Sequence, residues 1–178
     1  MKKYLFQSER LGFRTWEESD TEGLFSLVSN PEVMRYFPSP QNKQYAIDFI
    51  TRMNIQYTEF GYCYFAVDEL ESQNFTGFIG LSNQTYKADF NPSVDIGWRL
   101  LLEFWGKGFA TEGAKRCLQY ANEELNLAQI VSVAPVINQP SISVMEKTGM
   151  IKVKEFEHSL LAGSPELEKC VLYFIKVN

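Results

Sequence analysis

The fold of this protein is decided by residues 93–149, which read SVDIGWRLLLEFWGKGFATEGAKRCLQYANEELNLAQIVSVAPVINQPSISVMEKTG. Residues 94–102 are β-branched and apolar enough to predict a strand. A turn containing glycines follows at 105–110, and apolar residues then recur at spacings of three and four, which predicts one buried face of a helix. That face consists of Ala110, Ala114, Cys117, Leu118, Ala121 and Leu125. Residues 129–136 predict a second short strand.

The glycine turn between the strand and the helix predicts a site for an anion. The first backbone N–H groups of a helix have no partner within the helix and point outward, and the helix dipole adds positive potential there. Gly106 and Gly108 lack the Cβ atoms that would keep a phosphate away from the backbone. The turn is therefore expected to hold a pyrophosphate.

Two well-known phosphate-binding motifs fit this turn poorly. The G-x-x-x-x-G-K-[ST] loop of nucleotide triphosphatases has no counterpart in the chain. The dinucleotide fingerprint G-x-G-x-x-G requires a third glycine where Thr111 stands, and it requires an acidic residue about twenty positions later. No carboxylate lies at a strand end around Asn126.

The turn resembles the acetyl-CoA loop of the GNAT superfamily of N-acetyltransferases, written [QR]-x-x-G-x-[GA]. Gly108 and Ala110 match it, whereas Trp105 stands where Gln or Arg is usual. Residues 138–150 resemble the N-x-x-S-x-x-x-x-E-K-x-G-[FM] helix of the same family. Residues 8–11 and 30–38 resemble the opening of the branch that contains the RimJ and RimL ribosomal-protein N-terminal acetyltransferases. The four motifs occur in the family's order and cover nearly the whole chain.

The remaining segments predict a mixed α/β sheet. Alternation predicts strands over 4–14, 62–67, 75–82, 151–157 and 169–176. A helix is expected after a capping box formed by Ser19 and Glu22, with Asn30 and Pro31 ending it, and another helix is expected over 43–59. The carboxylates of residues 17–22 either attract a cationic substrate or, as the helix dipole favours, form a solvated helix start. The resemblance implies a GNAT-like, mostly antiparallel central sheet flanked by helices, with residues 1–178 forming one domain.

Composition excludes several functional classes. Three widely spaced cysteines and one histidine argue against a disulfide framework and a multi-histidine metal site, and they favour the cytoplasm. No apolar run approaches the roughly 20 residues that span a bilayer. The net charge of -5 disfavours nucleic acid and suits a cationic substrate. The expected partners are acetyl-CoA and an amine, without metal, nucleic acid or membrane, and a homodimer is considered.

The resemblance also implies which residues hold acetyl-CoA. The main chain of residues 98–100 would pair with the pantetheine arm, and the Leu100 N–H would face the thioester oxygen, as in an oxyanion hole. The turn would bind the pyrophosphate, and the helix after Asn138 would complete the site. The expected cofactor contacts are Trp98, Arg99, Leu100, Gly106, Lys107, Gly108, Phe109, Ala110, Thr111, Asn138, Ser141 and Lys147.

An amine can attack a thioester directly only when it is neutral. A lysine amine needs more help at pH 7 than a chain α-amine, because its ordinary pKa is about 10.4 rather than about 8. Asp95 is the first candidate for a base or for an anchor of the ammonium, acting through water, and Glu103 is the second. Many GNAT enzymes use a tyrosine four residues after the motif serine as the acid. Met145 stands there, so Ser141 with a water is the substitute.

The acceptor side is less determined by the sequence. Met34, Tyr36 and Phe37 either line the acceptor pocket or belong to the core, and Cys117 is expected in the core. The acceptor amine is a protein N-terminus or a small molecule. Two other functions remain: a non-catalytic acyl-CoA-binding module, which Met145 favours, and a nucleotide-binding regulator that uses the same turn.

Overall fold

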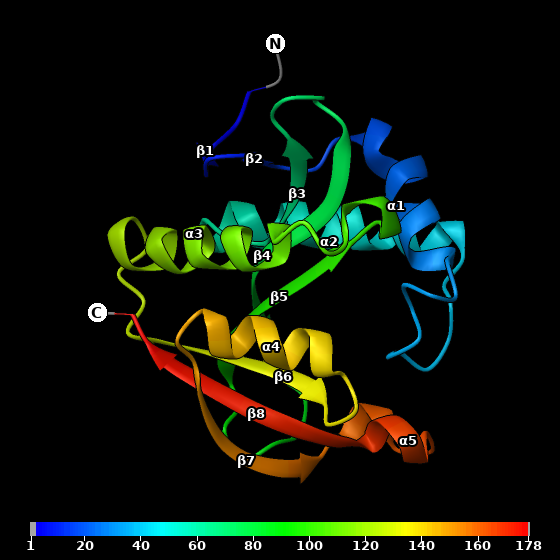
Figure 1. Ribbon diagram of the computed structural model, residues 1–178, viewed down its shortest axis with the longest axis vertical. Coiled ribbons are helices and arrows are strands. Elements are labelled where there is room, and N and C mark those ends of the chain that lie inside the picture. The colour runs from blue at the N-terminus through cyan, green and yellow to red at the C-terminus, as the bar shows by residue number, and fades with distance from the viewer. Residues whose placement is uncertain (1–2, 178) are drawn as a thin grey trace.

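The computed structural model describes residues 3–177. Eight strands form one sheet in the order β1-β2-β3-β4-β5-β6-β8-β7 (Figure 1). Neighbouring strands are antiparallel except β5 and β6, which are parallel. The strands are β1 (Phe6–Gln7), β2 (Leu11–Arg14), β3 (Tyr64–Glu69), β4 (Phe75–Gln84), β5 (Ser93–Leu100), β6 (Gln129–Pro135), β7 (Ile151–Glu157) and β8 (Lys169–Lys176). The predicted mixed, mostly antiparallel sheet is confirmed.

Helices cover both faces of this sheet. They are α1 (Thr21–Ser29), α2 (Lys43–Phe60), α3 (Phe109–Glu123), α4 (Gln139–Lys147) and the short α5 (Pro165–Glu168). The Phe78 ring of β4 packs 5.1 Å from Phe49 of α2, whereas Ile79 lies against Gly113 of α3. Because successive strand residues point to opposite faces, α2 and α3 lie on opposite sides of the sheet.

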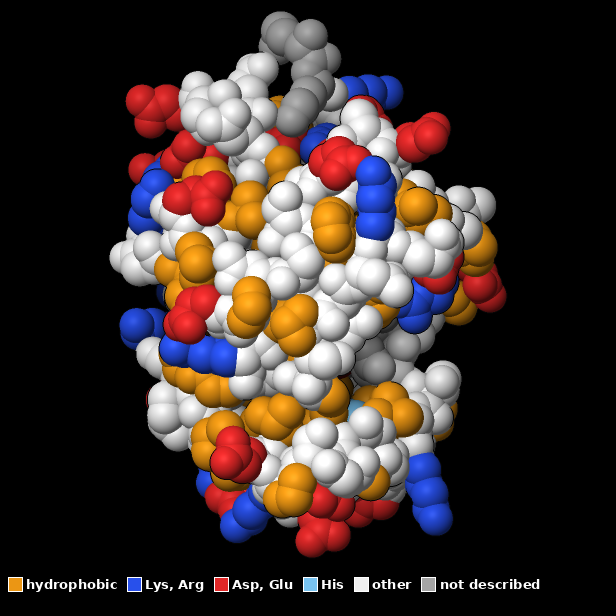
Figure 2. Space-filling model, turned by 90° about the vertical axis from the view of Figure 1, so that its right-hand side faces the viewer, with side chains coloured by type: hydrophobic (Ala, Val, Ile, Leu, Met, Phe, Trp, Pro, Cys, Tyr) orange, Lys and Arg blue, Asp and Glu red, His pale blue; other side chains and the backbone are white. Residues whose placement is uncertain are grey.

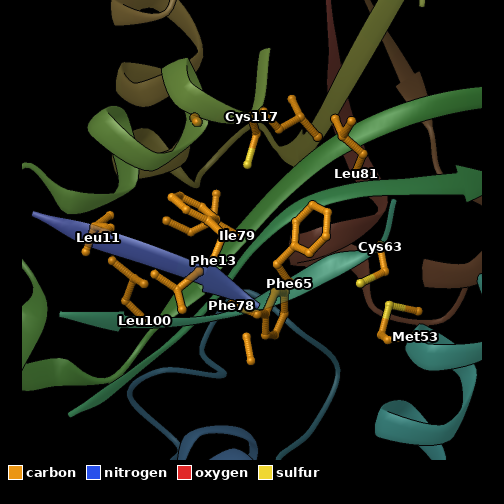
Figure 3. Close-up of a cluster of buried hydrophobic side chains, with 14 of the residues drawn as sticks. Leu11, Phe13, Met53, Cys63, Phe65, Phe78, Ile79, Leu81, Leu100 and Cys117 are labelled. Atoms are coloured by element: carbon orange, nitrogen blue, oxygen red, sulfur yellow. The ribbon is translucent and has the colours of Figure 1, made fainter. Parts of the chain in front are cut away.

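The core fills both layers beside β4. Figure 3 shows Cys117 on the α3 side of the strands and Met53 of α2 on the other side. Cys117 has no exposed surface, which confirms its expected place in the core. Burial of the α3 face is what an amphipathic helix needs to be stable, since isolated helices of this length are marginal in water.

The N-terminal segment differs from the single predicted strand. It forms β1 and β2 with a turn between them, because the Ser8 N–H donates to the Leu11 carbonyl at 2.9 Å and reverses the chain. The predicted capping box at Ser19 and Glu22 is also wrong. The reciprocal bonds join Glu17 and Asp20 at the short 3-10 helix η1 (Glu18–Asp20), which precedes α1.

Asp20 is not a solvated carboxylate at a helix start. The Arg14 guanidinium donates two bonds of 2.7 Å to Asp20 and bonds of 2.8 and 3.1 Å to Asp68. The side chains of Arg14, Asp20 and Asp68 are only 4%, 7% and 0% exposed. Burial opposes the charge of Arg14, but the bonds to both carboxylates outweigh it and raise the pKa of Arg14. This network attaches η1 to β2 and β3.

Within residues 3–177, no helix is long and apolar enough to cross a bilayer. Figure 2 faces the side of the molecule that carries α1, α2 and α5, and hydrophobic side chains are spread over the middle of that face.

Candidate active site

Two neighbouring strands separate at the centre of the sheet. β5 and β6 are paired only at Asp95 and Val131, and beyond this bridge they diverge (Figure 1). The Ser132 hydroxyl donates to the Ile96 carbonyl at 2.9 Å and closes the narrow end of the gap. The backbone of β5 after Ile96 therefore faces an opening instead of a neighbouring strand.

The alternation of β5 decides which of its backbone groups face that opening. The N–H of Leu101, just after β5, donates to the carbonyl of Thr76 in β4 at 2.9 Å, so the odd-numbered residues of β5 pair with β4. The carbonyls of Ile96 and Leu100 accept bonds from the other side. The N–H groups of Trp98 and Leu100 therefore point into the gap, whereas the backbone of Arg99 pairs with β4. This differs from the expectation that all three residues offer their main chain to a ligand.

The turn that follows β5 has the conformation its glycines allow. Gly106 and Gly108 have φ angles of 73° and 81°, in the left-handed region where a Cβ is unfavourable. Gly108 is the N-cap of α3 and has no side chain to cap it, and the first intrahelical bond runs from the Glu112 N–H to the Gly108 carbonyl. The N–H groups of Phe109, Ala110 and Thr111 are thus free of intrahelical partners and suit an anionic ligand.

The turn between β1 and β2 fixes this helix start. Glu112 in the first turn of α3 accepts bonds from the Ser8 hydroxyl at 2.6 Å and from the Arg10 Nε at 2.7 Å. Arg10 also donates to the Lys107 carbonyl at 3.0 Å. The sequence motif at residues 8–11 therefore holds the glycine turn and the start of α3 in place through these hydrogen bonds. Sequence reasoning singled out this motif but did not foresee that contact.

Helix α4 supplies the third wall. The Asn138 side chain caps α4 by accepting from the Ser141 N–H at 3.2 Å, and Pro140 occupies an early helical position that suits it. The Ser141 side chain is half-buried beside the gap, Lys147 is exposed at the far end, and Met145 is 1% exposed.

A cavity of about 530 Å³ lies between the α3 turn, the end of β5 and α4. All predicted cofactor contacts line it except Lys107. The Lys107 side chain lies instead over the Phe104 ring, at 5.0 Å, and only its backbone contributes to the turn. We call this cavity the cofactor-side cavity.

A second cavity of about 240 Å³ continues on the opposite face of β5, and we call it the acceptor-side cavity. The two cavities share the residues Tyr36, Phe37, Trp98, Arg99, Asn138 and Ser141. A larger surface groove of about 980 Å³ between α1 and α2 shares no residue with either cavity.

The floor of the acceptor-side cavity holds Asp95. Asp95 accepts a 2.7 Å bond from the Tyr64 hydroxyl and a 3.1 Å bond from Gln84 Nε2. Gly97 leaves room for the Tyr64 ring that carries this hydroxyl, since a Cβ at residue 97 would lie only 3.0 Å from the ring. Neither Tyr64 nor Gln84 was identified from the sequence, because only the pairing of β3, β4 and β5 brings them to Asp95.

Burial sets the charge state of Asp95. It raises the pKa of Asp95 to about 6, while the bonds from Tyr64 and Gln84 oppose this rise by stabilising the carboxylate. Burial and the nearby carboxylate raise the pKa of Tyr64 well above its ordinary value, so its hydroxyl stays protonated and donates. Asp95 can therefore exchange a proton near neutral pH.

The other candidates divide between cavity, core and surface. Tyr36 and Phe37 line both cavities, but Met34 is 2% exposed, belongs to the core and lines neither. Glu103 is exposed in the short helix η2 (Leu102–Phe104) and lines neither cavity. His158 directly follows β7 and is half-buried. It caps the short helix η3 (Ser159–Leu161) and stacks on Tyr86 at 4.2 Å. Among residues 3–177, no group of three or more His, Cys, Asp and Glu side chains is placed to hold a metal.

Comparison with known proteins agrees with this geometry. Residues 10–151 match the acetyltransferase (GNAT) domain family. The chain is 26% identical over 150 residues to the uncharacterized N-acetyltransferase YoaA of Bacillus subtilis, covering 83% of this chain and 83% of YoaA.

Two solved structures show the same fold. A GNAT-family acetyltransferase from Bacillus anthracis has a TM-score of 0.78 at 26% identity, over 96% of this chain and 97% of its own. The spermidine N-acetyltransferase of Vibrio cholerae, solved with CoA and spermine, has a TM-score of 0.73 at 20% identity, over 94% of this chain and 95% of its own. The protein is thus an N-acetyltransferase and belongs to the GNAT family.

Proposed function

We propose that this enzyme transfers the acetyl group of acetyl-CoA directly to the amine of a small molecule bound in the acceptor-side cavity. The observation that supports this most is the meeting of the two cavities at the open backbone of β5. One has free helical N–H groups that suit a pyrophosphate, and the other has a titrating carboxylate. The fit of acetyl-CoA to the first cavity rests on those donors and on the unpaired edge of β5.

In this mechanism Asp95 holds the incoming ammonium and accepts its proton through a water molecule. The Leu100 N–H, which points into the gap, donates to the thioester oxygen as negative charge develops there. Preorganised donors of this kind contribute on the order of 10²–10³ in rate. Ser141, the half-buried hydroxyl between the cavities, delivers a proton toward the leaving sulfur through water, since Met145 cannot do so.

The remaining cofactor contacts follow from the cavity wall. The N–H groups of residues 108–111 would hold the pyrophosphate, the backbone of Trp98 would pair with the pantetheine arm, and Asn138 and Lys147 would border it. Tyr36 and Phe37, which line both cavities, would enclose the reacting amine. A protein N-terminus, the acceptor of the RimJ/RimL-like branch, is the competing acceptor. The three cysteines are free and buried, which supports a cytoplasmic location.

Ligand binding is expected to stabilise the enzyme selectively. Acetyl-CoA or CoA at roughly 100 times its dissociation constant should add about 2.7 kcal/mol to the free energy of unfolding, or several degrees in melting temperature. ATP and NAD at the same concentration should add nothing. A shift with ATP or NAD alone would favour a nucleotide-binding regulator. A CoA shift without release of CoA in the presence of any amine would favour a non-catalytic binding module.

The activity is expected to depend on the ionisation of Asp95. Because its carboxylate is the active form, kcat/KM should fall as pH drops through about 6, where Asp95 takes up a proton. The Tyr64→Phe variant removes a bond that stabilises the carboxylate, so this fall should move to higher pH. Profiles of log kcat/KM against pH measure both effects.

Tyr62→Phe is the matched control for this experiment, because the Tyr62 hydroxyl donates to Asn83 at 2.7 Å and does not contact Asp95. Its profile should coincide with that of the unmodified enzyme. A Tyr64→Phe profile that does not move, or that moves to lower pH, would rule out Asp95 as the titrating group.

A further inference from the structure

One partly buried cation in the acceptor-side cavity lacks an anionic partner. No carboxylate of residues 3–177 forms an ion pair with Arg99, although the buried Arg14 has two such partners. The Nε of Arg99 is buried and has no hydrogen-bond partner. A buried donor without a partner costs free energy, so this Nε points to a group that binds there.

The Arg99 guanidinium lies on the acceptor side of β5. It stacks 3.7 Å from the Phe37 ring and 5.3 Å from the Phe78 ring, and its charge interacts with the Tyr45 hydroxyl. Phe78 and Tyr45 line the acceptor-side cavity but not the cofactor-side cavity. Arg99 and Asp95 are four residues apart on one strand and so lie on the same face of the sheet. Burial lowers the pKa of Arg99, but an arginine stays protonated in proteins.

The charges of this cavity define a class of ligand. Among the residues that line it, Arg99 is the only base and Asp95 is the only acid. A single planar guanidinium matches a carboxylate, which it can bind with two parallel bonds. A dianionic phosphate would be matched by more than one cation, and a polyamine by more than one acid. A volume of about 240 Å³ suits a molecule of amino-acid size.

We propose that Arg99 is a specificity-determining residue that binds a carboxylate of the acceptor, so that the substrates of this enzyme are small amines carrying a carboxylate. The inference rests on the proposed function. Aromatic side chains on the wall, among them Tyr45, Phe49 and Phe78, would pack against the apolar part of such a substrate. The amine would then face Asp95 and the open end of β5.

Matched acceptors test this proposal. CoA release is measured with phenylalanine and with 3- and 4-(aminomethyl)benzoate, each against its carboxamide. The ratio of kcat/KM for acid over amide should be about 10- to 100-fold higher in the unmodified enzyme than in Arg99→Gln, the usual range for a bond to a charged group. Dividing the acid-over-amide ratio of the unmodified enzyme by that of Arg99→Gln cancels the effect of the different amine pKa values of each acid and its carboxamide. Arg99→Lys keeps the charge but not the paired donors. Its acid-over-amide ratio should lie between those of the unmodified enzyme and Arg99→Gln.

Arg52→Gln is the matched control. Arg52 also lies near the rings of Tyr45 and Phe49, at 6.0 and 5.9 Å, but it is exposed and lines neither cavity. Its acid-over-amide ratio should equal that of the unmodified enzyme. Each variant should still bind CoA, which a general disruption of the fold would not allow.

A binding measurement decides the proposal independently of turnover. In protein saturated with CoA, 3-phenylpropanoate should raise the melting temperature and 3-phenylpropanamide should not, and Arg99→Gln should abolish the difference. Turnover of carboxamides as fast as acids would overturn the role of Arg99 and leave the transferase function intact. If no amine releases CoA, the proposed function fails. The thermal response then decides alone: a carboxylate response lost in Arg99→Gln supports the site, and no response overturns it.

Discussion

Asp95→Asn is expected to lose about 10²–10⁴-fold in kcat/KM while binding acetyl-CoA as tightly as the unmodified enzyme. The amide oxygen of asparagine can still accept the 2.7 Å bond from the Tyr64 hydroxyl, so the floor of the acceptor-side cavity should keep its shape. An amide cannot take up the proton of an ammonium or balance its charge. Steady-state release of CoA gives kcat/KM, and CoA titration followed by melting temperature gives the affinity.

Glu103→Gln is the control for Asp95→Asn, because Glu103 is the other acidic candidate and is exposed outside both cavities. It should keep kcat/KM within about twofold, since surface substitutions away from a site have small effects. The fall of activity below pH 6 should disappear in Asp95→Asn and persist in Glu103→Gln. If Asp95→Asn keeps nearly full activity, or if Glu103→Gln loses it, the base has been assigned to the wrong residue.

Arg14→Met is expected to destabilise the protein more than any surface substitution. The two carboxylates that Arg14 binds, Asp20 and Asp68, are almost completely buried and would lose the cation that they share. Removing one member of a buried ionic network costs about 3–5 kcal/mol. For a chain of this length the melting temperature should fall on the order of 10 °C. Urea denaturation followed by circular dichroism measures the free energy of unfolding.

The matched control for Arg14→Met is Arg35→Met, which removes an arginine from an exposed pair. Arg35 binds Glu32 at 2.7 Å, and both side chains are largely exposed, at 41% and 54%. Exposed pairs of this kind contribute about 0–1 kcal/mol because water and salt screen them. Equal losses in the two variants would show that burial does not set the strength of the Arg14 network.

Local patterns were enough to predict much of the fold. The spacing of apolar residues in α3 and the glycines at 106 and 108 specify a strand, a turn and a helix without knowledge of the rest of the chain. The reason is that a helical face and a left-handed turn each depend on a few consecutive residues. The predicted strands at 62–67 and 75–82 appear as β3 and β4 for the same reason.

Local patterns failed where a distant partner decides the environment. The sequence predicts Asp20 to be one of several solvated acids at a helix start. In the structure Asp20 is buried in η1 and forms an ion pair with Arg14. Met34 reads equally as core or pocket, and only the packing of the segment before α2 places it in the core. The pairing of β5 with β4 could not be read from β5 alone. It directs the backbone of Arg99 toward β4, and the Arg99 side chain lines the acceptor-side cavity.

Short motifs and periodicity were enough to identify the family, the central strands and helices, and the turn at the start of α3. The surroundings of Asp95 and Arg99 could be known only from the folded structure. The partners of these two residues, Tyr64, Gln84, Phe37 and Phe78, come from separate strands and a loop that meet only when the sheet is assembled. Charge state and specificity depend on burial and on long-range neighbours, which no local pattern specifies.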